Sequence, residues 1–199
     1  MRRTQQDRSN STKAALVAAA RELFAARGYA AVPADDIVRA AGVTRGALYH
    51  HYADKQGLFH AVVEEIEREL TAEIDAVLRA APDPVSGMGE SLRVFLDACL
   101  RDEVRQISLT DAPAVLGWAT LREIEAEHGL GLLVGVLEKG MAQGQVKPQP
   151  VRTLAQLVLS AVIEAVRLIA DAPDPDLARS EVEQVLATWL AALLVTSPE

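Results

Sequence analysis

The stretch AGVTRGALYHHYADKQGLF, residues 41–59, contains the features that decide the fold. Thr44 is a helix-capping residue, and RGALYHH after it reads as a short helix. Before this stretch, Pro33 suits the first turn of another short helix, PADDIVRAAG, which ends at Gly42. Two short helices joined by a tight turn that contains glycine are typical of a helix-turn-helix motif.

Helical patterns continue through the rest of the 199 residues. Only 4% of the chain is aromatic, and no long alternating pattern indicates a strand. Helical spacing and capping residues, such as Ser11 or Thr12 for the first helix, predict helices at about residues 11–28, 33–42, 45–51, 54–81, 90–102, 113–128, 129–143, 151–172 and 177–195. The segment APDPVSGMG, residues 81–89, is expected to break the chain between two of them. The fold class is therefore all-α with about nine helices.

The helices have apolar faces that predict a core. In the first helix the residues that share one face are Leu16, Ala20, Leu23 and Phe24. The long helix at residues 54–81 has an apolar stripe and an acidic face, which we expect to be solvated: Glu64, Glu65, Glu67, Glu69 and Glu73.

The net charge of −8 is unevenly distributed. Residues 1–55, including Arg2 and Arg3, hold nine Lys and Arg against five Asp and Glu, so the acidic excess lies in the rest of the chain. A basic N-terminal quarter in an acidic protein indicates that only this quarter meets a polyanion. The alternative is a chance asymmetry between solvated surfaces. We expect an N-terminal tail and helix-turn-helix domain at residues 1–54 and a second domain at residues 55–199.

Helical geometry divides the ring residues of the opening stretch between two faces. Leu48 and Tyr52 are four residues apart and point inward, where Val43 and Ile37 complete a small core. The opposite face is small at its start and polar at its end, with Thr44, Arg45, Gly46, Ala47, Tyr49 and His50. A helix that enters the DNA major groove needs this arrangement.

Each exposed residue suits a contact with DNA. Arg45 can form a bidentate contact with a guanine edge or pair with a phosphate, and Gly46 and Ala47 allow close approach. Tyr49, His50 and Lys55 can donate to phosphates, whereas the role of His51 stays open. Taken singly, Arg45 is also consistent with an ordinary surface arginine, and Tyr49 with half-buried packing.

The chain has no convincing metal site or catalytic arrangement. His50 and His51 are adjacent and diverge, His60 and Glu64 offer only two ligands, and a single Glu-x-x-His element ends at His128. We therefore expect no metal, no cofactor and no enzymatic activity. The N-terminus lacks the apolar core of a signal peptide, and no segment reads as a membrane span, so we expect a cytoplasmic protein.

The run DDIVRAAGVTRGALYHHYADKQGLF, with AARELFAARGYAAV before it, resembles the DNA-binding signature of the TetR family of bacterial transcriptional regulators. The resemblance covers about residues 11–60. It implies a three-helix DNA-binding domain, a helical ligand-binding domain, and a homodimer built from the last two helices. It also implies that Lys55 contacts a phosphate. One departure is Pro33, where the family often has Ser or Thr, so a phosphate contact there falls to the backbone N–H of Ala34.

The ligand-binding domain would need a cavity, and polar residues among apolar helices suggest where it lies. The predicted ligand-binding residues are Phe95, Cys99, Trp118, Leu121, Arg122, Glu125, Glu164 and Arg167. Glu164 and Arg167, three residues apart, are equally consistent with an ion pair, Trp118 with core packing, and Cys99 with an inert buried thiol or a redox switch. An apolar pocket with a few polar groups favours a small, mainly hydrophobic effector.

The last two helices are apolar over more surface than one small bundle needs, which favours a twofold dimer. The predicted interface residues are Leu157, Ala161, Leu168, Val182, Leu186, Trp189 and Leu193. The alternative is that both helices belong to the monomer core.

Together these patterns predict a repressor that leaves double-stranded operator DNA when the effector binds. The long helix from Asp54, which joins the DNA-binding domain to the rest of the chain, would transmit the effect of the effector. The competing hypotheses are a small-molecule-binding helical dimer or enzyme that keeps the fold without specific DNA binding, and a purely structural dimer.

Overall fold

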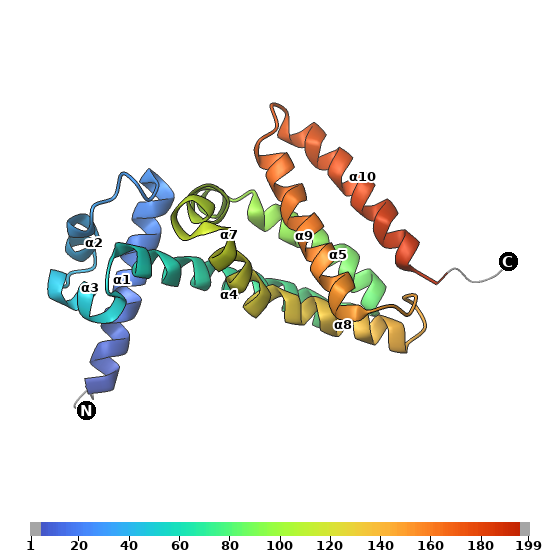
Figure 1. Ribbon diagram of the computed structural model, residues 1–199, viewed down its shortest axis with the longest axis horizontal. Helices are drawn as coiled ribbons and strands as arrows, with labels where there is room; N and C mark the ends of the chain where they lie inside the picture. The colour runs from blue at the N-terminus through green and yellow to red at the C-terminus, as the bar shows by residue number, and fades with distance from the viewer. Residues whose placement is uncertain (1–4, 196–199) are drawn as a thin grey trace. The chain divides into compact units, whose positions relative to one another are not determined.

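The computed structural model describes residues 5–195, and within them the chain is helical apart from one isolated bridge (Figure 1). Its elements are α1 (Gln5–Arg27), α2 (Ala34–Ala40), α3 (Arg45–Tyr52), α4 (Lys55–Ala80), α5 (Pro84–Cys99), α6 (Asp102–Val104), the π-helical turn η1 (Arg105–Asp111), α7 (Ala112–Glu125), a second π-helical turn η2 (Ala126–Leu130), α8 (Gly131–Ala142), α9 (Val151–Ala170) and α10 (Pro175–Leu193). Counting the run from Asp102 to Ala142, which is kinked at Gly117, as one helix gives eight. The all-α prediction is confirmed. Arg2 and Arg3 of the predicted basic quarter lie outside the described residues.

Two of the helix boundaries that differ from the sequence-based prediction have a local cause. The first helix begins at Gln5 rather than at a cap near Ser11, because the polar residues before Ser11 continue the helix and Gln6 bonds Asn10 across one turn at 3.2 Å. The predicted break at residues 81–89 is also too long. Asp83 caps α5 by accepting from the backbone N–H groups of Val85 and Ser86, so the helix begins at Pro84.

The first compact unit holds the described residues up to Ile66 together with Asp102–Arg122. Its core includes the predicted Leu16, Ala20 and Phe24, all fully buried. The Phe24 and Phe59 rings meet edge to face with centroids 5.3 Å apart, which joins α1 to α4. This aromatic packing fixes the helices on which α3 rests.

The segment Asp102–Arg122 is attached to the N-terminal helices by polar contacts. Arg21 of α1 forms a bidentate pair with Glu103, with Nη2 to Oε2 at 3.0 Å. The Asp111 carboxylate accepts from the Tyr29 backbone N–H at 2.8 Å, and the Gln56 amide donates to the Val115 carbonyl at 2.8 Å. The first compact unit therefore includes a segment that follows α5 in the sequence.

The second compact unit holds Glu67–Arg101 and the described residues from Glu123 onward. Gly87 allows α5 to approach α4 closely, since a Cβ there would lie 3.1 Å from Ala81 and 3.3 Å from Leu78. Around Val146 a small core joins α8 and α9. The end of α10 is tied to the loop before α9 by a backbone bond from Lys147 to the Leu193 carbonyl at 2.8 Å.

Among residues 5–195, α9 is the one helix long and apolar enough to cross a membrane, a property it shares with core helices of water-soluble proteins. Four of its residues are buried in the chain itself: Ala155, Ala165, Val166 and Ile169.

Candidate nucleic-acid interface

The leading end of α3 is capped and exposed. Thr44 has extended backbone angles, φ −86° and ψ 155°, and its hydroxyl accepts from the Ala47 backbone N–H at 3.3 Å. A Cβ on Gly46 would meet only the Thr44 Oγ1, at 3.9 Å. Nothing inside the chain therefore requires glycine at this position, and its small size leaves room for a partner at the outer surface.

Arg45 is held in place by two neighbours. Its Nη1 lies 3.1 Å from the Asp35 carboxylate of α2, and its Nη2 lies 3.3 Å from the Tyr49 hydroxyl one turn along α3. The Tyr49 hydrogen bond and then the Asp35 charge raise the pKa of the guanidinium. The guanidinium also lies 5.6 Å from the centre of the Tyr49 ring. Asp35 is a functional neighbour that sequence reasoning missed, because the pair spans ten residues and two helices.

The trailing end of α3 carries a pair of histidines. His50 is exposed and His51 half-buried, and their ring centroids are 5.0 Å apart. Partial burial lowers the pKa of His51, and the nearby charges of His50 and Lys13 lower it further. Tyr52 is half-buried, as predicted, and its hydroxyl donates to the Lys13 carbonyl at 3.3 Å.

Lys55 stands at the first position of α4 and reaches back to the turn before α2. Its ammonium donates to the carbonyl oxygens of Tyr29 and Val32, each at 3.0 Å. Burial lowers the pKa of Lys55. One of its three N–H groups is left for the predicted phosphate contact. Ala34 is the first residue of α2, behind Pro33, which makes no side-chain cap.

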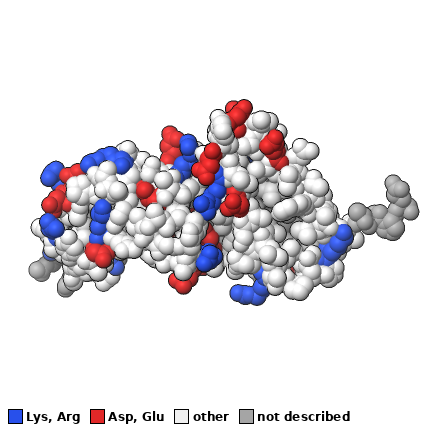
Figure 2. Space-filling view, turned by 45° about the horizontal axis from the view of Figure 1, so that its top comes forward, with Lys and Arg blue, Asp and Glu red and all other residues white. Residues whose placement is uncertain are grey.

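Basic side chains near α3 lie among acidic ones. Figure 2 shows Lys and Arg intermixed with Asp and Glu on the visible face. On α2, Asp36 pairs with Arg27 at 2.9 Å and with Arg39 at 3.3 Å. Part of the basic excess near α3 is therefore neutralised within the chain.

The predicted ligand-binding residues fall in both compact units. Trp118, which is 43% exposed, the buried Leu121 and the exposed Arg122 belong to the first. The others belong to the second: Phe95, Cys99, Glu125, Glu164 and Arg167. Glu164 is exposed, and Arg167 on the same helix is half-buried.

Glu67 of α4 was wrongly predicted to lie on a solvated face. Burial, followed by the charge of Glu125, raises its pKa to about 7. Burial and then the charge of Glu67 raise the pKa of the Cys99 thiol. Glu67 lies one helical turn from the buried Val63 and Leu70, a spacing that could have revealed its position. The structure thus brings Glu67 together with the predicted Cys99 and Glu125.

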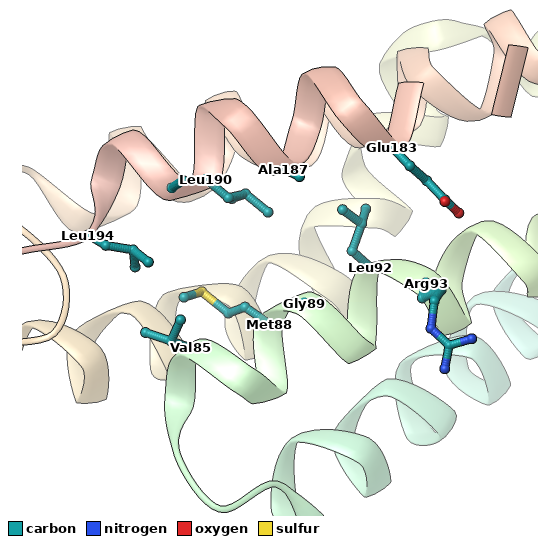
Figure 3. A pocket seen from close by; sticks show the side chains of 10 residues that line it. Val85, Met88, Gly89, Leu92, Arg93, Glu183, Ala187, Leu190 and Leu194 are labelled. Carbon is teal, nitrogen blue, oxygen red and sulfur yellow. The ribbon is translucent and has the colours of Figure 1, made fainter. Parts of the chain in front are cut away.

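The second unit also contains an apolar groove of about 330 Å³ between α5 and α10 (Figure 3). Its lining residues are Val85, Met88, Gly89, Leu92, Arg93, Glu183, Ala187, Leu190, Ala191 and Leu194. Arg93 of α5 and Glu183 of α10 both lie at one end of the groove, on its opposite walls, while the rest of the lining is apolar. The Arg93 guanidinium pairs with Glu90 at 2.7 Å, and Glu183 pairs with Arg179 at 2.9 Å. None of the predicted ligand-binding residues lines this groove.

Large apolar side chains are exposed on the last two helices. On α9, Leu157 is 65% and Leu168 57% exposed, and on α10 Trp189 is 60% exposed. Of the other predicted interface residues, Leu186 is buried within the chain, and the half-buried ones are Ala161, Val182 and Leu193. Val185, absent from the predicted set, is 49% exposed.

Two family descriptions match the chain. "Bacterial regulatory proteins, tetR family" matches residues 16–62, and "Tetracyclin repressor-like, C-terminal domain" matches residues 85–193. The chain is 31% identical to the transposon Tn10 TetC protein of Escherichia coli over 72% of each chain. It is 29% identical to the HTH-type transcriptional repressor BepR of Brucella suis over 81% of each chain.

Solved structures agree with these matches. A TetR-family transcriptional regulator from Pectobacterium atrosepticum is similar with a TM-score of 0.86 and 34% identity. The similarity covers 98% of this chain and 100% of that one. It therefore extends beyond the helix-turn-helix to the C-terminal helices.

Proposed function

The chain belongs to the tetR family of bacterial regulatory proteins, and on that premise we propose that it is a homodimeric repressor released from operator DNA by a small, mainly hydrophobic effector. Its relatives are transcriptional regulators and not enzymes. Such a regulator acts where the chromosome is, so we propose a cytoplasmic location.

The proposal that the protein recognises DNA bases rests on the leading end of α3. Thr44 fixes the start of the helix, Asp35 and Tyr49 hold the Arg45 fork, and Gly46 leaves the outer surface open. Arg45 would leave Asp35 for a guanine edge or a phosphate, with Ala47 beside a thymine methyl. The contact with Tyr49 would keep the guanidinium oriented during this exchange.

The proposed phosphate contacts flank this reading end. Tyr49 and His50 are exposed, and Lys55 has one donor left. The backbone N–H of Ala34 lies in the first turn of α2, where helical geometry leaves N–H groups without intrahelical partners. These contacts would fix the register of α3 without reading sequence.

We propose that the dimer forms through the exposed apolar faces of α9 and α10. Leu157, Leu168, Val185 and Trp189 are large and exposed in the single chain, and such patches usually mark interfaces. Leu186 would support this face from inside the chain. A twofold dimer would have to hold its two α3 helices about 34–36 Å apart to enter successive major grooves.

For the effector we propose the groove between α5 and α10. Its volume of about 330 Å³ falls within the range of small-molecule sites, and its apolar walls suit a hydrophobic body. Arg93 and Glu183 at one end would interact with a polar group of the effector. A second candidate is the interior around Phe95, Cys99 and Glu125, which the raised pKa of Glu67 favours because strongly shifted pKa values are common at binding sites. Trp118, Leu121, Arg122, Glu164 and Arg167 stay predictions.

Fluorescence anisotropy with the DNA upstream of the protein's own gene tests the proposal. We expect this DNA to bind about a thousandfold or more tightly than random DNA of the same length at one salt concentration. Equal affinity for both would favour the alternative, a small-molecule-binding helical dimer without specific DNA binding.

A further inference from the structure

Three basic side chains meet at the trailing end of α3. His50 and His51 form its last turn, with ring centroids 5.0 Å apart. Lys13 of α1 is close enough for its charge to lower the pKa of His51, and the Tyr52 hydroxyl fixes its backbone at 3.3 Å. Two helices thus contribute to one cluster of basic side chains, defined by Lys13, His50 and His51.

This cluster has no counter-charge of its own. Within residues 5–195, the side chains of Lys13, His50 and His51 form no hydrogen bond or ion pair. The charge of Glu65 of α4 reaches Tyr52, but Glu65 pairs with Arg21 at 3.4 Å. Asp54, in the turn after α3, accepts from the Gly57 backbone N–H at 2.7 Å.

The leading end of α3 is different. There Asp35 pairs with Arg45 at 3.1 Å, and Asp36 pairs with both Arg27 and Arg39. The trailing end is therefore the part of this surface where an external anion would meet basic side chains that are not paired within residues 5–195.

We propose that Lys13, His50 and His51 form a clamp for a DNA backbone phosphate, and that this clamp takes up protons when the operator binds. The inference rests on the proposed function, because the phosphate comes from the operator. It adds Lys13 and His51 to the contact surface and gives operator affinity a dependence on pH. A protonated imidazole donates a stronger, charge-assisted hydrogen bond to a phosphate oxygen than a neutral one.

The direction of the effect follows from the charges. In the free protein, partial burial, then His50 and then Lys13 lower the pKa of His51, so the neutral ring is favoured. A bound phosphate favours the protonated ring and raises that pKa. Binding then takes up a proton between the two pKa values, and affinity rises as pH falls through the range near the ordinary histidine value of about 6.5. One proton gives at most about a tenfold change in affinity per pH unit.

The four histidines provide a matched test. Operator affinity is measured by anisotropy at fixed ionic strength from about pH 6 to about pH 8. We expect affinity to rise as pH falls for wild type, less steeply for His50→Gln and His51→Gln, and hardly at all for the double variant. His60→Gln, on α4 beside Glu64, and His128→Gln, in the second unit, should keep the wild-type slope.

Two further measurements keep the outcomes distinct. Calorimetry of wild type in buffers of different ionisation enthalpy counts the protons taken up, so the inference does not depend on whether the double variant folds. Lys13→Gln should reduce the salt dependence of binding by about one phosphate contact. Operator binding without proton uptake, or a wild-type slope in the folded double variant, would overturn the clamp alone. Absence of DNA binding at every pH would overturn the proposed function as well.

Discussion

The Lys55 ammonium lies 3.8 Å from the centre of the Tyr29 ring and donates to the carbonyl oxygen of the same residue at 3.0 Å. A second bond, to Val32, closes the turn between α1 and α2. The Tyr29 backbone N–H in turn donates to Asp111 at 2.8 Å. One lysine at the start of α4 therefore supports the turn that positions α2, and the same turn is held by the segment that follows α5.

We expect Lys55→Met to have two separate effects. Loss of the ammonium leaves two carbonyls without their donor, which should lower the free energy of unfolding by about 1–3 kcal/mol. Loss of its remaining N–H should reduce the slope of log affinity against log salt by about one. Thermal denaturation and anisotropy at several salt concentrations measure the two effects.

Lys147→Met is the matched control, because Lys147 also donates to a backbone carbonyl, that of Ala192, but lies in the second unit. It should leave the salt slope unchanged. An unchanged slope in Lys55→Met as well would limit Lys55 to a structural role.

Arg45→Ala should weaken operator binding by about 1–3 kcal/mol and relax the preference at one base pair. Arg45→Lys should recover little, because lysine keeps the charge but loses the planar fork. Tyr49→Phe should have a smaller effect, since it removes only the hydroxyl that holds Arg45 at 3.3 Å. Anisotropy against a set of single-base operator variants measures both affinity and preference.

Arg39→Ala is the control for charge, because Arg39 is exposed on α2 and also pairs with an aspartate. It should lower affinity evenly across the base variants. If Arg39→Ala relaxed the base preference and Arg45→Ala did not, the bases would be read from α2 and not from α3.

The helix-turn-helix could be predicted from sequence because its signals are local. Thr44 caps the helix that follows it, and Leu16, Phe24 and Leu48 lie at helical spacings that mark buried faces. Capping and periodicity depend on residues a few positions apart. They are therefore readable without knowing which helices meet.

Contacts between distant residues were not predictable in this way. The Asp35–Arg45 pair depends on the crossing of α2 and α3, and the Arg21–Glu103 pair spans 82 residues. Glu67 is a clearer example of a position that was not predicted from the sequence. Its face of α4 carries enough acidic residues to read as solvated, yet burial raises the pKa of this one carboxyl.

Filling the groove between α5 and α10 should prevent small apolar molecules from binding there. Gly89 lines the groove, and a Cβ on it would meet no atom within 4 Å, so Gly89→Phe should fit without disturbing α5. We expect it to reduce the fluorescence of bound 1-anilinonaphthalene-8-sulfonate several-fold. Gly135→Phe, at an equally open glycine of α8, should keep the wild-type signal. If both variants gave equal signals, the probe would not bind in this groove. The interior near Glu67 would then be the better candidate for the effector site.

A charge on the exposed face of α9 or α10 should separate the dimer. Leu168→Glu and Trp189→Glu each place a carboxylate on a surface that is about three-fifths exposed in the single chain. Sedimentation analysis should show monomers, and operator affinity should fall because two linked α3 helices bind better than one. Leu177→Glu alters a leucine that is 57% exposed at the start of α10, on a different side of the helix from Trp189, and should remain dimeric. Dimers in all three variants would place the interface elsewhere.

Glu67 should make folding stability fall as pH rises. Its pKa in the folded chain is about 7, against an ordinary value near 4.5, because burial and then Glu125 disfavour the charged form. Between these values the folded chain keeps a proton that the unfolded chain has lost, so stability decreases through this window and the full cost is present above it. Glu67→Gln carries no such proton, so its melting temperature should change less between about pH 5 and about pH 8 and exceed that of wild type at the upper end. Glu123→Gln, at an exposed residue of α7, should follow the wild-type profile. If Glu67→Gln also followed it, the carboxyl at position 67 would be ionised in the folded protein, and the case for an interior effector site beside it would be lost.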